Sequence, residues 1–389
     1  EKIAEIVSHV LDFAMRARAS DVHVEPQEKS TRVRYRIDGI LQEKLTIPKE
    51  LHDSLISRIK ILSGMKIDEK RVPQDGRFNF KAGDNEVDLR VSSLPTTWGE
   101  KIVLRLLKKS GGVPELTELG LRGRGLKNLE DAILRPHGII IICGPTGSGK
   151  TTTLYSVISK ISTSKINVVT LEDPIEYKIP GVNQVQINPA AGLTFASGLR
   201  SFLRQDPNVI LVGEIRDKET ADLAIQASLT GHLVFSTLHT NDASGALPRL
   251  LDMGAEPYLL ASSMTAIVAQ RVVRKIHDKC KEEYDPDPKI MEDMKNVLGT
   301  LWPQGRDGKL YKGKGDAECG DSGYYGRVGI FEVLPVTEKL GRLILERSAS
   351  RDIEKIAREE GMITLKQDGY LKVLEGITSI EEVLRVAQE

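Results

Sequence analysis

Residues 144–151 constrain the fold more than any other segment of the chain. They read Gly-Pro-Thr-Gly-Ser-Gly-Lys-Thr, a complete phosphate-binding loop. An apolar, β-branched run at 139–142 precedes the loop, and residues 152–161 follow it with apolar side chains at helical spacing. A strand, a glycine turn and a helix N-terminus together form a nest of backbone N–H groups that faces a polyphosphate. The segment therefore predicts an α/β fold that binds a nucleoside triphosphate.

The predicted nucleotide site includes the loop and the first turn of the helix. Lys150 would reach the β- and γ-phosphates, and the Thr151 hydroxyl would bind Mg²⁺. Glu214 ends a strand at 208–213 in the position of a Walker-B acid, and its length allows it to hold Mg²⁺ through a water molecule. The predicted nucleotide-binding residues are Gly144, Pro145, Thr146, Gly147, Ser148, Gly149, Lys150, Thr151 and Thr152.

Candidate catalytic groups follow two other predicted strands. The strand at 168–171 is followed by three acids around a proline, among them Glu172 and Glu176, and His239 follows the strand at 233–236. These groups would meet at the carboxyl edge of a parallel sheet, where ligands bind. One carboxylate could orient the attacking water, or the acids could only cap and solvate a turn.

Arginines could stabilise the charge that develops on the γ-phosphate. Such a cation lies beside the nucleotide and often comes from another domain or subunit, so hydrolysis would depend on domain closure. Taken singly, each arginine is also explained as a surface charge. The candidates are Arg90 and Arg105 in the first part of the chain, and Arg200, Arg204, Arg216 and Arg249 in the second.

The 389 residues are too many for one compact core. In the first part, helical spacings at 3–14 and 55–67 alternate with strand-like runs at 22–24, 32–37, 77–80, 86–91 and 101–107. The second part alternates apolar strands with helices, the pattern of a parallel sheet covered on both faces. The expected segments are an α/β domain at 1–108, a linker at 109–120, a second α/β domain at 121–270, a glycine- and proline-rich lobe at 271–330 and a helical region at 331–389.

The charge balance and the number of cysteines narrow the possible partners and the cellular compartment of the protein. Lysine and arginine number 55, as do aspartate and glutamate, so no global field draws the chain to nucleic acid or to an anionic membrane. No apolar stretch approaches the roughly 20 residues that span a bilayer. Three cysteines fit a reducing, cytoplasmic setting. Because the first residue is Glu1 and not methionine, we expect the chain to be part of a longer protein.

Separated blocks of sequence, all in one order, make the chain resemble the secretion ATPases of type II secretion and type IV pilus assembly, the GspE/PilB family. The resemblance implies a PAS-like domain at 1–108, a RecA-like ATPase domain at 121–270 and a homohexameric ring. It also implies that hydrolysis of ATP with Mg²⁺ moves the two domains and drives a membrane-embedded assembly platform. The blocks lie at 19–26, 71–77, 144–151, 171–176, 203–217 and 230–241.

The resemblance also implies partners and residue roles. The ring would lie at the cytoplasmic face of the inner membrane and reach the membrane only through a platform protein and an adaptor, without nucleic acid. Glu176 would position the attacking water, with Glu172 as the alternative. Glu214 would be the Walker-B acid, and His239 matches the His box. Arginines that approach the γ-phosphate from the first domain match Arg90 and Arg105, and those at the site or the subunit boundary match Arg200, Arg204, Arg216 and Arg249.

The lobe departs from the family pattern. The assembly branch usually binds structural zinc through two Cys-x-x-Cys pairs, which here read His277-Asp-Lys-Cys280 and Asp316-Ala-Glu-Cys319. Because histidine and aspartate can also bind zinc, a Cys₂-His-Asp site keeps the required spacing. We hypothesise one Zn²⁺ here; the alternative is a metal-free lobe held by its glycine and proline residues.

Two further functions share these motifs. A retraction motor or a conjugation-type ATPase would have the same catalytic parts, although the lobe argues against retraction and the zero net charge argues against direct DNA contact. A ring that binds nucleotide only as a structural switch would not need the full set of acids and arginines.

Overall fold

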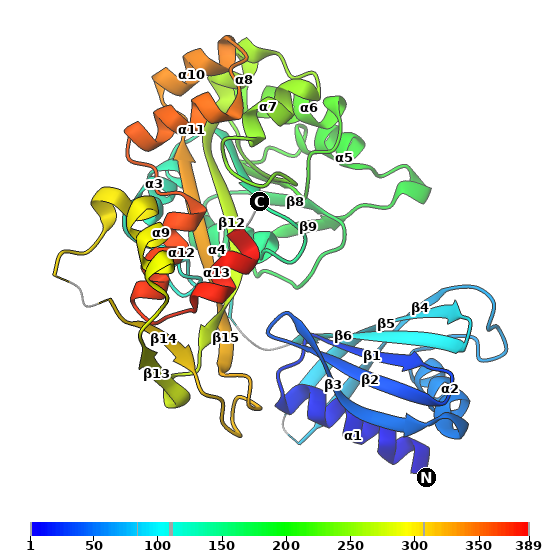
Figure 1. The fold of residues 1–389 in the computed structure, drawn as a ribbon. Coiled ribbons are helices and arrows are strands. Elements are labelled where there is room, and N and C mark those ends of the chain that lie inside the picture. Colours follow the sequence, from blue (N-terminus) through cyan, green and yellow to red (C-terminus); the bar gives the residue numbers. More distant parts are fainter. Residues whose placement is uncertain (1, 84, 109–111, 306–307, 388–389) are drawn as a thin grey trace. The chain divides into compact units, whose positions relative to one another are not determined.

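The computed structural model describes residues 2–83, 85–108, 112–305 and 308–387, which form two compact units, Glu1–Gly112 and Val113–Glu389 (Figure 1). Each unit has its own hydrophobic core. None of the helices in the described ranges has both the length and the apolar character needed to cross a membrane.

The first unit is an antiparallel six-stranded sheet with two helices on one face (Figure 1). Its strands bury alternate side chains: Val33 and Tyr35 enter the core, whereas Arg32 and Arg34 lie on the opposite face. The elements are α1 (Lys2–Arg16), β1 (Asp21–Pro26), β2 (Ser30–Ile37), β3 (Ile40–Pro48), α2 (His52–Leu62), β4 (Gln74–Ala82), β5 (Asn85–Thr96) and β6 (Gly99–Lys108), and the strand order is β3-β2-β1-β6-β5-β4.

The second unit contains a seven-stranded sheet that is parallel except for its edge strand β15. The strands are β7 (Gly138–Cys143), β8 (Val168–Glu172), β9 (Asn183–Gln186), β10 (Val209–Val212), β11 (Leu233–Leu238), β12 (Met264–Ile276) and β15 (Tyr324–Pro335), in the order β15-β12-β7-β11-β10-β8-β9. The helices are α3 (Gly123–Ile133), α4 (Lys150–Ile161), α5 (Phe195–Phe202), α6 (Lys218–Leu229), α7 (Ala246–Asp252), α8 (Pro257–Ser263), α10 (Glu338–Leu345), α11 (Ser350–Glu359), α12 (Leu365–Leu374) and α13 (Ile380–Ala387).

Helices cover both faces of this sheet, which explains why its central strands are apolar throughout. In β7, Ile140 and Ile142 enter the core beneath α3 and α4. Ile139 and Ile141 enter the core on the other face, which α5, α6, α7 and α8 close. Because β7, β10 and β11 pair in parallel, their carboxyl ends meet at one edge of the sheet, as the sequence predicts.

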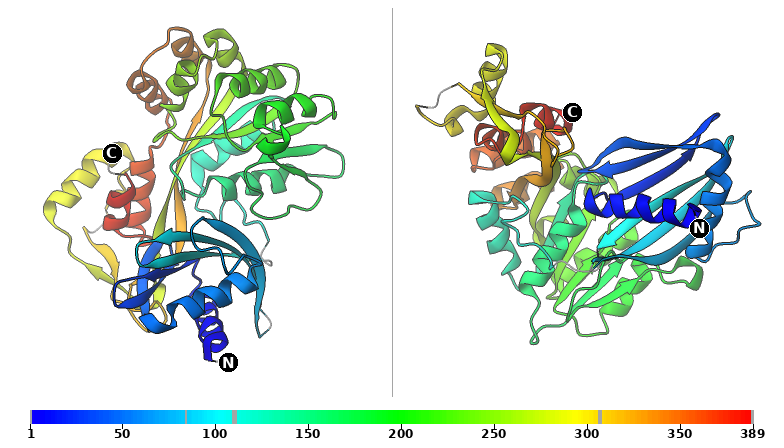
Figure 2. Two further views of the ribbon diagram at one scale, coloured as in Figure 1. Left: turned by 90° about the vertical axis from the view of Figure 1, so that its right-hand side faces the viewer. Right: turned by 90° about the horizontal axis from the view of Figure 1, so that it is seen from below.

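A lobe is inserted between the antiparallel neighbours β12 and β15, with β13 (Lys281–Tyr284), α9 (Pro288–Leu298) and β14 (Leu310–Gly313). Two segment boundaries expected from the sequence, after 270 and after 330, fall inside β12 and β15, because both strands continue in the main sheet. Met294 and Leu298 of α9 pack against Tyr370 and Val373 of α12, and both views of Figure 2 show α9 beside the last helices.

Candidate functional site

The segment at 144–151 connects β7 to α4, and glycines shape its turn. Gly144, Gly147 and Gly149 have φ angles of 150°, 80° and 86°, which other residues rarely adopt. A Cβ atom on Gly149 would lie 2.7 Å from Gln270 Nε2. Because α4 begins directly after Gly149, its first N–H groups point toward the loop. The backbone thus forms a cradle of donors, and at Gly144 and Gly149 it leaves little room for a side chain.

Two polar side chains of the loop fit a phosphate ligand. Lys150 Nζ lies 2.7 Å from the carbonyl oxygen of Gly144 and 3.0 Å from that of Pro145, and burial lowers the pKa of Lys150. The Ser148 hydroxyl is buried and has no hydrogen-bond partner among the described residues. A buried donor without a partner is costly, whereas a phosphate oxygen would satisfy it.

The predicted acid and histidine come together beside the loop. Val212 of β10 and Ser236 of β11 are register partners, so the residues that follow them converge. A Glu214 carboxylate oxygen lies 2.5 Å from Arg216 Nη2, and the other lies 3.7 Å from His239 Nε2. Burial and then the charge of Lys150 lower the pKa of His239, whereas Glu214 acts in the opposite direction. Lysine, glutamate and histidine therefore share one electrostatic environment.

The acids that follow β8 differ in exposure. Glu172 is 4% exposed. Its carboxylate accepts hydrogen bonds from Tyr155 Oη, from Thr170 Oγ1 at 2.6 Å and from Gln184 Nε2 at 3.1 Å. The Tyr155 hydroxyl also accepts a hydrogen bond of 3.3 Å from the backbone N–H of Glu176, which is half-buried. Tyr155 thus anchors the loop after β8 to α4, the helix that begins at the phosphate loop.

The arginines of the first unit lie opposite each other. Arg90 of β5 and Arg105 of β6 are register partners on the sheet face away from the helices. Arg105 Nε donates a hydrogen bond of 3.0 Å to Asp21 Oδ1. The proposed roles of these two arginines at a nucleotide stay predictions.

Among the other arginines, only Arg216 contacts Glu214. Arg200 of α5 pairs with Glu219, and Arg204 donates a hydrogen bond of 3.2 Å to the carbonyl oxygen of Arg200. Arg249 is exposed on α7. Within the described ranges, Arg200, Arg204 and Arg249 make no hydrogen bond or ion pair with the phosphate loop or with Glu214, so any role at a subunit boundary stays a prediction.

The structure brings together the four residues of the expected metal site. One ligand atom from each of His277, Cys280, Asp316 and Cys319 lies within 4.8 Å of the others. Nδ1 of His277 is buried and lies 3.0 Å from Asp316 Oδ2, but it has no hydrogen-bond partner among the described residues. The backbone N–H of Gly315 donates to Cys280 Sγ at 3.4 Å. Two sulfurs, an imidazole nitrogen and a carboxylate suit tetrahedral zinc.

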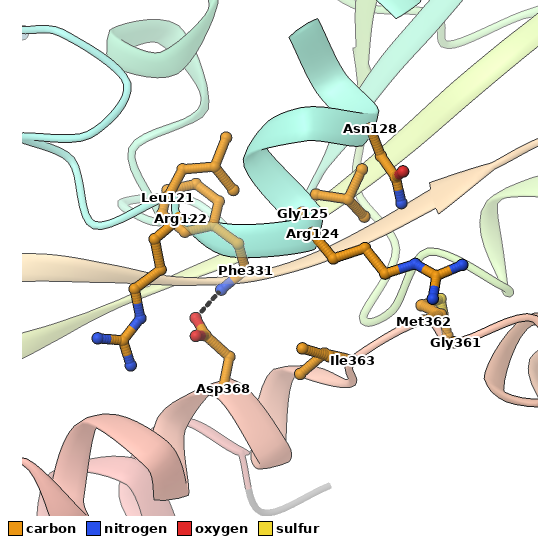
Figure 3. A pocket seen from close by; sticks show the side chains of 11 residues that line it. Leu121, Arg122, Arg124, Gly125, Asn128, Phe331, Gly361, Met362, Ile363 and Asp368 are labelled. Atoms are coloured by element: carbon orange, nitrogen blue, oxygen red, sulfur yellow. Dashed lines mark hydrogen bonds between the residues drawn. The ribbon is translucent and has the colours of Figure 1, made fainter. Parts of the chain in front are cut away.

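A small hollow lies apart from these residues, between α3, β15 and the start of α12 (Figure 3). Its volume is about 30 Å³. Figure 3 shows the Asp368 carboxylate on this hollow, where it accepts a 2.8 Å hydrogen bond from the N–H of Phe331. None of the predicted site residues lines it.

Reasoning from the sequence missed two residues that support the site, Tyr155 and Gln270. Tyr155 is fully buried in a helix whose apolar spacing gives no sign of a hydrogen-bonding role. Gln270 and Arg271 interrupt the apolar residues of β12. Two polar residues within an apolar strand are a sequence signal for a buried polar role.

Comparison with known proteins gives matches over nearly the whole chain. The family described as Type II/IV secretion system protein matches residues 1–385. The type IV pilus assembly ATPase PilB of Thermus thermophilus is 47% identical over 98% of the chain, which spans 42% of that protein. The type II secretion system protein E of Pseudomonas aeruginosa is 47% identical over the full chain, which spans 76% of it. The type II secretion system ATPase E of Vibrio cholerae is 46% identical over the full chain, which spans 76% of that protein.

Solved structures share the fold. The ATPase DotB of Legionella pneumophila has a TM-score of 0.71 at 23% identity, covering 99% of this chain and 96% of that chain. The pilus retraction motor PilT with bound ADP has a TM-score of 0.64 at 25% identity, covering 98% of this chain and 97% of that chain. Both matches cover nearly the whole chain, so this chain shares the fold of these two proteins.

Proposed function

This chain belongs to the type II/IV secretion system protein family and is an ATPase, and we propose that the whole protein uses ATP hydrolysis to assemble a type IV pilus or a type II secretion pseudopilus. The observation that carries this proposal is the identity of 46–47% to relatives named for these two systems. The identity to the retraction motor is 25%, which makes retraction the weaker candidate. The first unit would be the PAS-like domain, and the lobe the metal-binding element.

Each group of site residues would have its own role in the transfer of the γ-phosphoryl group from ATP to water. The loop N–H groups and Lys150 would bind the β- and γ-phosphates, and Thr151 and Glu214 would hold Mg²⁺, which would neutralise phosphate charge. Glu214 also holds Arg216, and it faces His239. A positioned carboxylate orients the water for in-line attack on the γ-phosphate.

We assign the orientation of the water to Glu176 and a structural role to Glu172. The Glu172 carboxylate is buried and already accepts hydrogen bonds from three side chains of its own unit. Losing these bonds would leave buried polar groups without partners. Glu176 follows the anchored segment, and its backbone is tied to Tyr155. Glu172 therefore fixes the loop from which Glu176 acts.

The proposed machine is a homohexamer at the cytoplasmic face of the inner membrane, with a platform protein and an adaptor as partners. We expect ATP hydrolysis per chain to rise with protein concentration as hexamers form, measured beside light scattering on the same samples. We expect Arg90→Ala to lower the hexamer's rate by about 10- to 100-fold, the effect of losing one charge-assisted contact.

Arg16→Ala is the matched control, because Arg16 is also in the first unit, is exposed and pairs with Asp12. A monomer that hydrolyses ATP as fast as the hexamer, with Arg90→Ala at the wild-type rate, would contradict the ring motor.

We also propose that the lobe binds one zinc ion through His277, Cys280, Asp316 and Cys319. Protein purified without chelator should contain one equivalent of zinc per chain by metal analysis. Cys280→Ser and Cys319→Ser should contain almost none and should unfold at temperatures lower by about 5 °C or more. Cys143→Ala, which changes the remaining cysteine, should keep its zinc. Well under one equivalent in the wild-type protein would refute the site.

A further inference from the structure

Gln270 of β12 makes two hydrogen bonds to the segment that holds the phosphates. It is 3% exposed. Its Nε2 donates to the carbonyl oxygen of Ser148 at 2.8 Å, and its Oε1 accepts from Thr153 Oγ1 at 2.7 Å. A carbonyl oxygen can only accept and a hydroxyl can donate, so both ends of the amide are satisfied in this one orientation. One side chain thus joins the phosphate loop to the first turn of α4.

The bond to Ser148 sets the direction of a phosphate-binding donor. In a trans peptide, the carbonyl oxygen of one residue and the N–H of the next point in opposite directions. Holding the Ser148 carbonyl against Gln270 therefore turns the Gly149 N–H away from β12. The Thr153 bond fixes the helix turn on which Lys150 lies.

Gln270 also packs closely against two glycines of the loop, which leaves the loop little freedom to move. Its backbone oxygen would lie 2.6 Å from a Cβ atom on Gly144, and its Nε2 would lie 2.7 Å from one on Gly149. Its own position is fixed in turn, since the Arg271 guanidinium donates to the carbonyl oxygens of Gln270 at 3.1 Å and of Asn241 at 2.7 Å. This close packing ties both ends of the loop, Gly144 and Gly149, to β12.

We infer that Gln270 is a positioning residue for ATP binding: it touches no phosphate, but it orients the N–H groups of the loop and the start of α4. The inference rests on the ATPase site and does not depend on which fibre the protein assembles. It predicts that removing the amide raises the Kd for ATP, and that a loss of stability alone does not explain this rise.

The test is the Kd for ATP with Mg²⁺, measured by calorimetry on the full chain, together with the melting temperature with and without ATP. Gln270→Met keeps the length and loses both hydrogen bonds, and we expect its Kd to rise about tenfold. The control is Gln367→Met, because Gln367 is also buried and donates to a backbone carbonyl, that of Val297. It should lose stability but keep the wild-type Kd.

Thr153→Val is a milder variant that decides the question if Gln270→Met folds poorly. It should raise the Kd by a smaller factor, and the double variant should bind no more weakly than Gln270→Met alone, because both changes break one shared bond. The inference is overturned if Thr153→Val and Gln270→Met keep the wild-type Kd, or if Gln367→Met weakens ATP binding as much as Gln270→Met does.

Discussion

Replacing Lys150 with alanine is expected to lower the rate of ATP hydrolysis by about 1000-fold. Lys150 lies at the start of α4, partly buried, with its ammonium group on the carbonyl oxygens of the phosphate loop. The substitution therefore removes the cation that would meet the β- and γ-phosphates, where charge increases in the transition state.

The measurement is steady-state release of inorganic phosphate at saturating ATP, with circular dichroism to check the fold. Lys160→Ala is the matched control, because Lys160 lies near the end of the same helix, is half exposed and pairs with Glu130. It should hydrolyse ATP at the wild-type rate. A Lys150→Ala protein with wild-type turnover would show that hydrolysis takes place elsewhere.

Glu214→Gln should lower kcat by a similar factor, about 100- to 1000-fold, while ATP still binds. The variant keeps the shape of the side chain but removes the negative charge that would hold Mg²⁺ and that faces Arg216 and His239. Because the Glu214 charge raises the pKa of His239, that pKa should fall further in the variant.

Rates from phosphate release and the His239 pKa from NMR titration test both parts of this prediction. Glu256→Gln is a suitable control, because Glu256 is exposed at the start of α8 and makes no side-chain capping bond there. Unchanged turnover in Glu214→Gln would remove Glu214 from the site. An unchanged His239 pKa would mean that the two side chains do not interact in solution.

The parts of the site that the sequence predicted are those that local patterns determine. Lys150, Glu214 and His239 each follow an apolar strand, and parallel strands place their carboxyl ends at one edge. The support of the site could not be found in this way, because it depends on pairs far apart in the chain. Gln270 and Ser148, for example, are separated by 122 positions, and only the strand order brings them together.

The same limit applies to the fold. No pattern predicted β3, because it is the edge strand of its sheet and only Ile47 among its nine residues is buried. The predicted helix at 55–67 is too long, since α2 ends at Leu62, just before Gly64 with its φ of 71°. Hydrophobic spacing records neither an edge strand, which depends on its place in the sheet, nor a glycine that ends a helix.

The position of the lobe has a consequence for how related chains can diverge. It joins two strands whose ends, Ile276 and Tyr324, are register partners, so a short hairpin turn could replace it without rebuilding the sheet. Its helix α9, however, covers Tyr370, Val373 and other apolar side chains of the last helices. A homologue that lost the lobe would expose this surface to water unless polar residues replaced it. The presence or loss of the lobe should therefore be readable from the outer face of α12 and α13, even where the inserted sequence itself has changed beyond alignment.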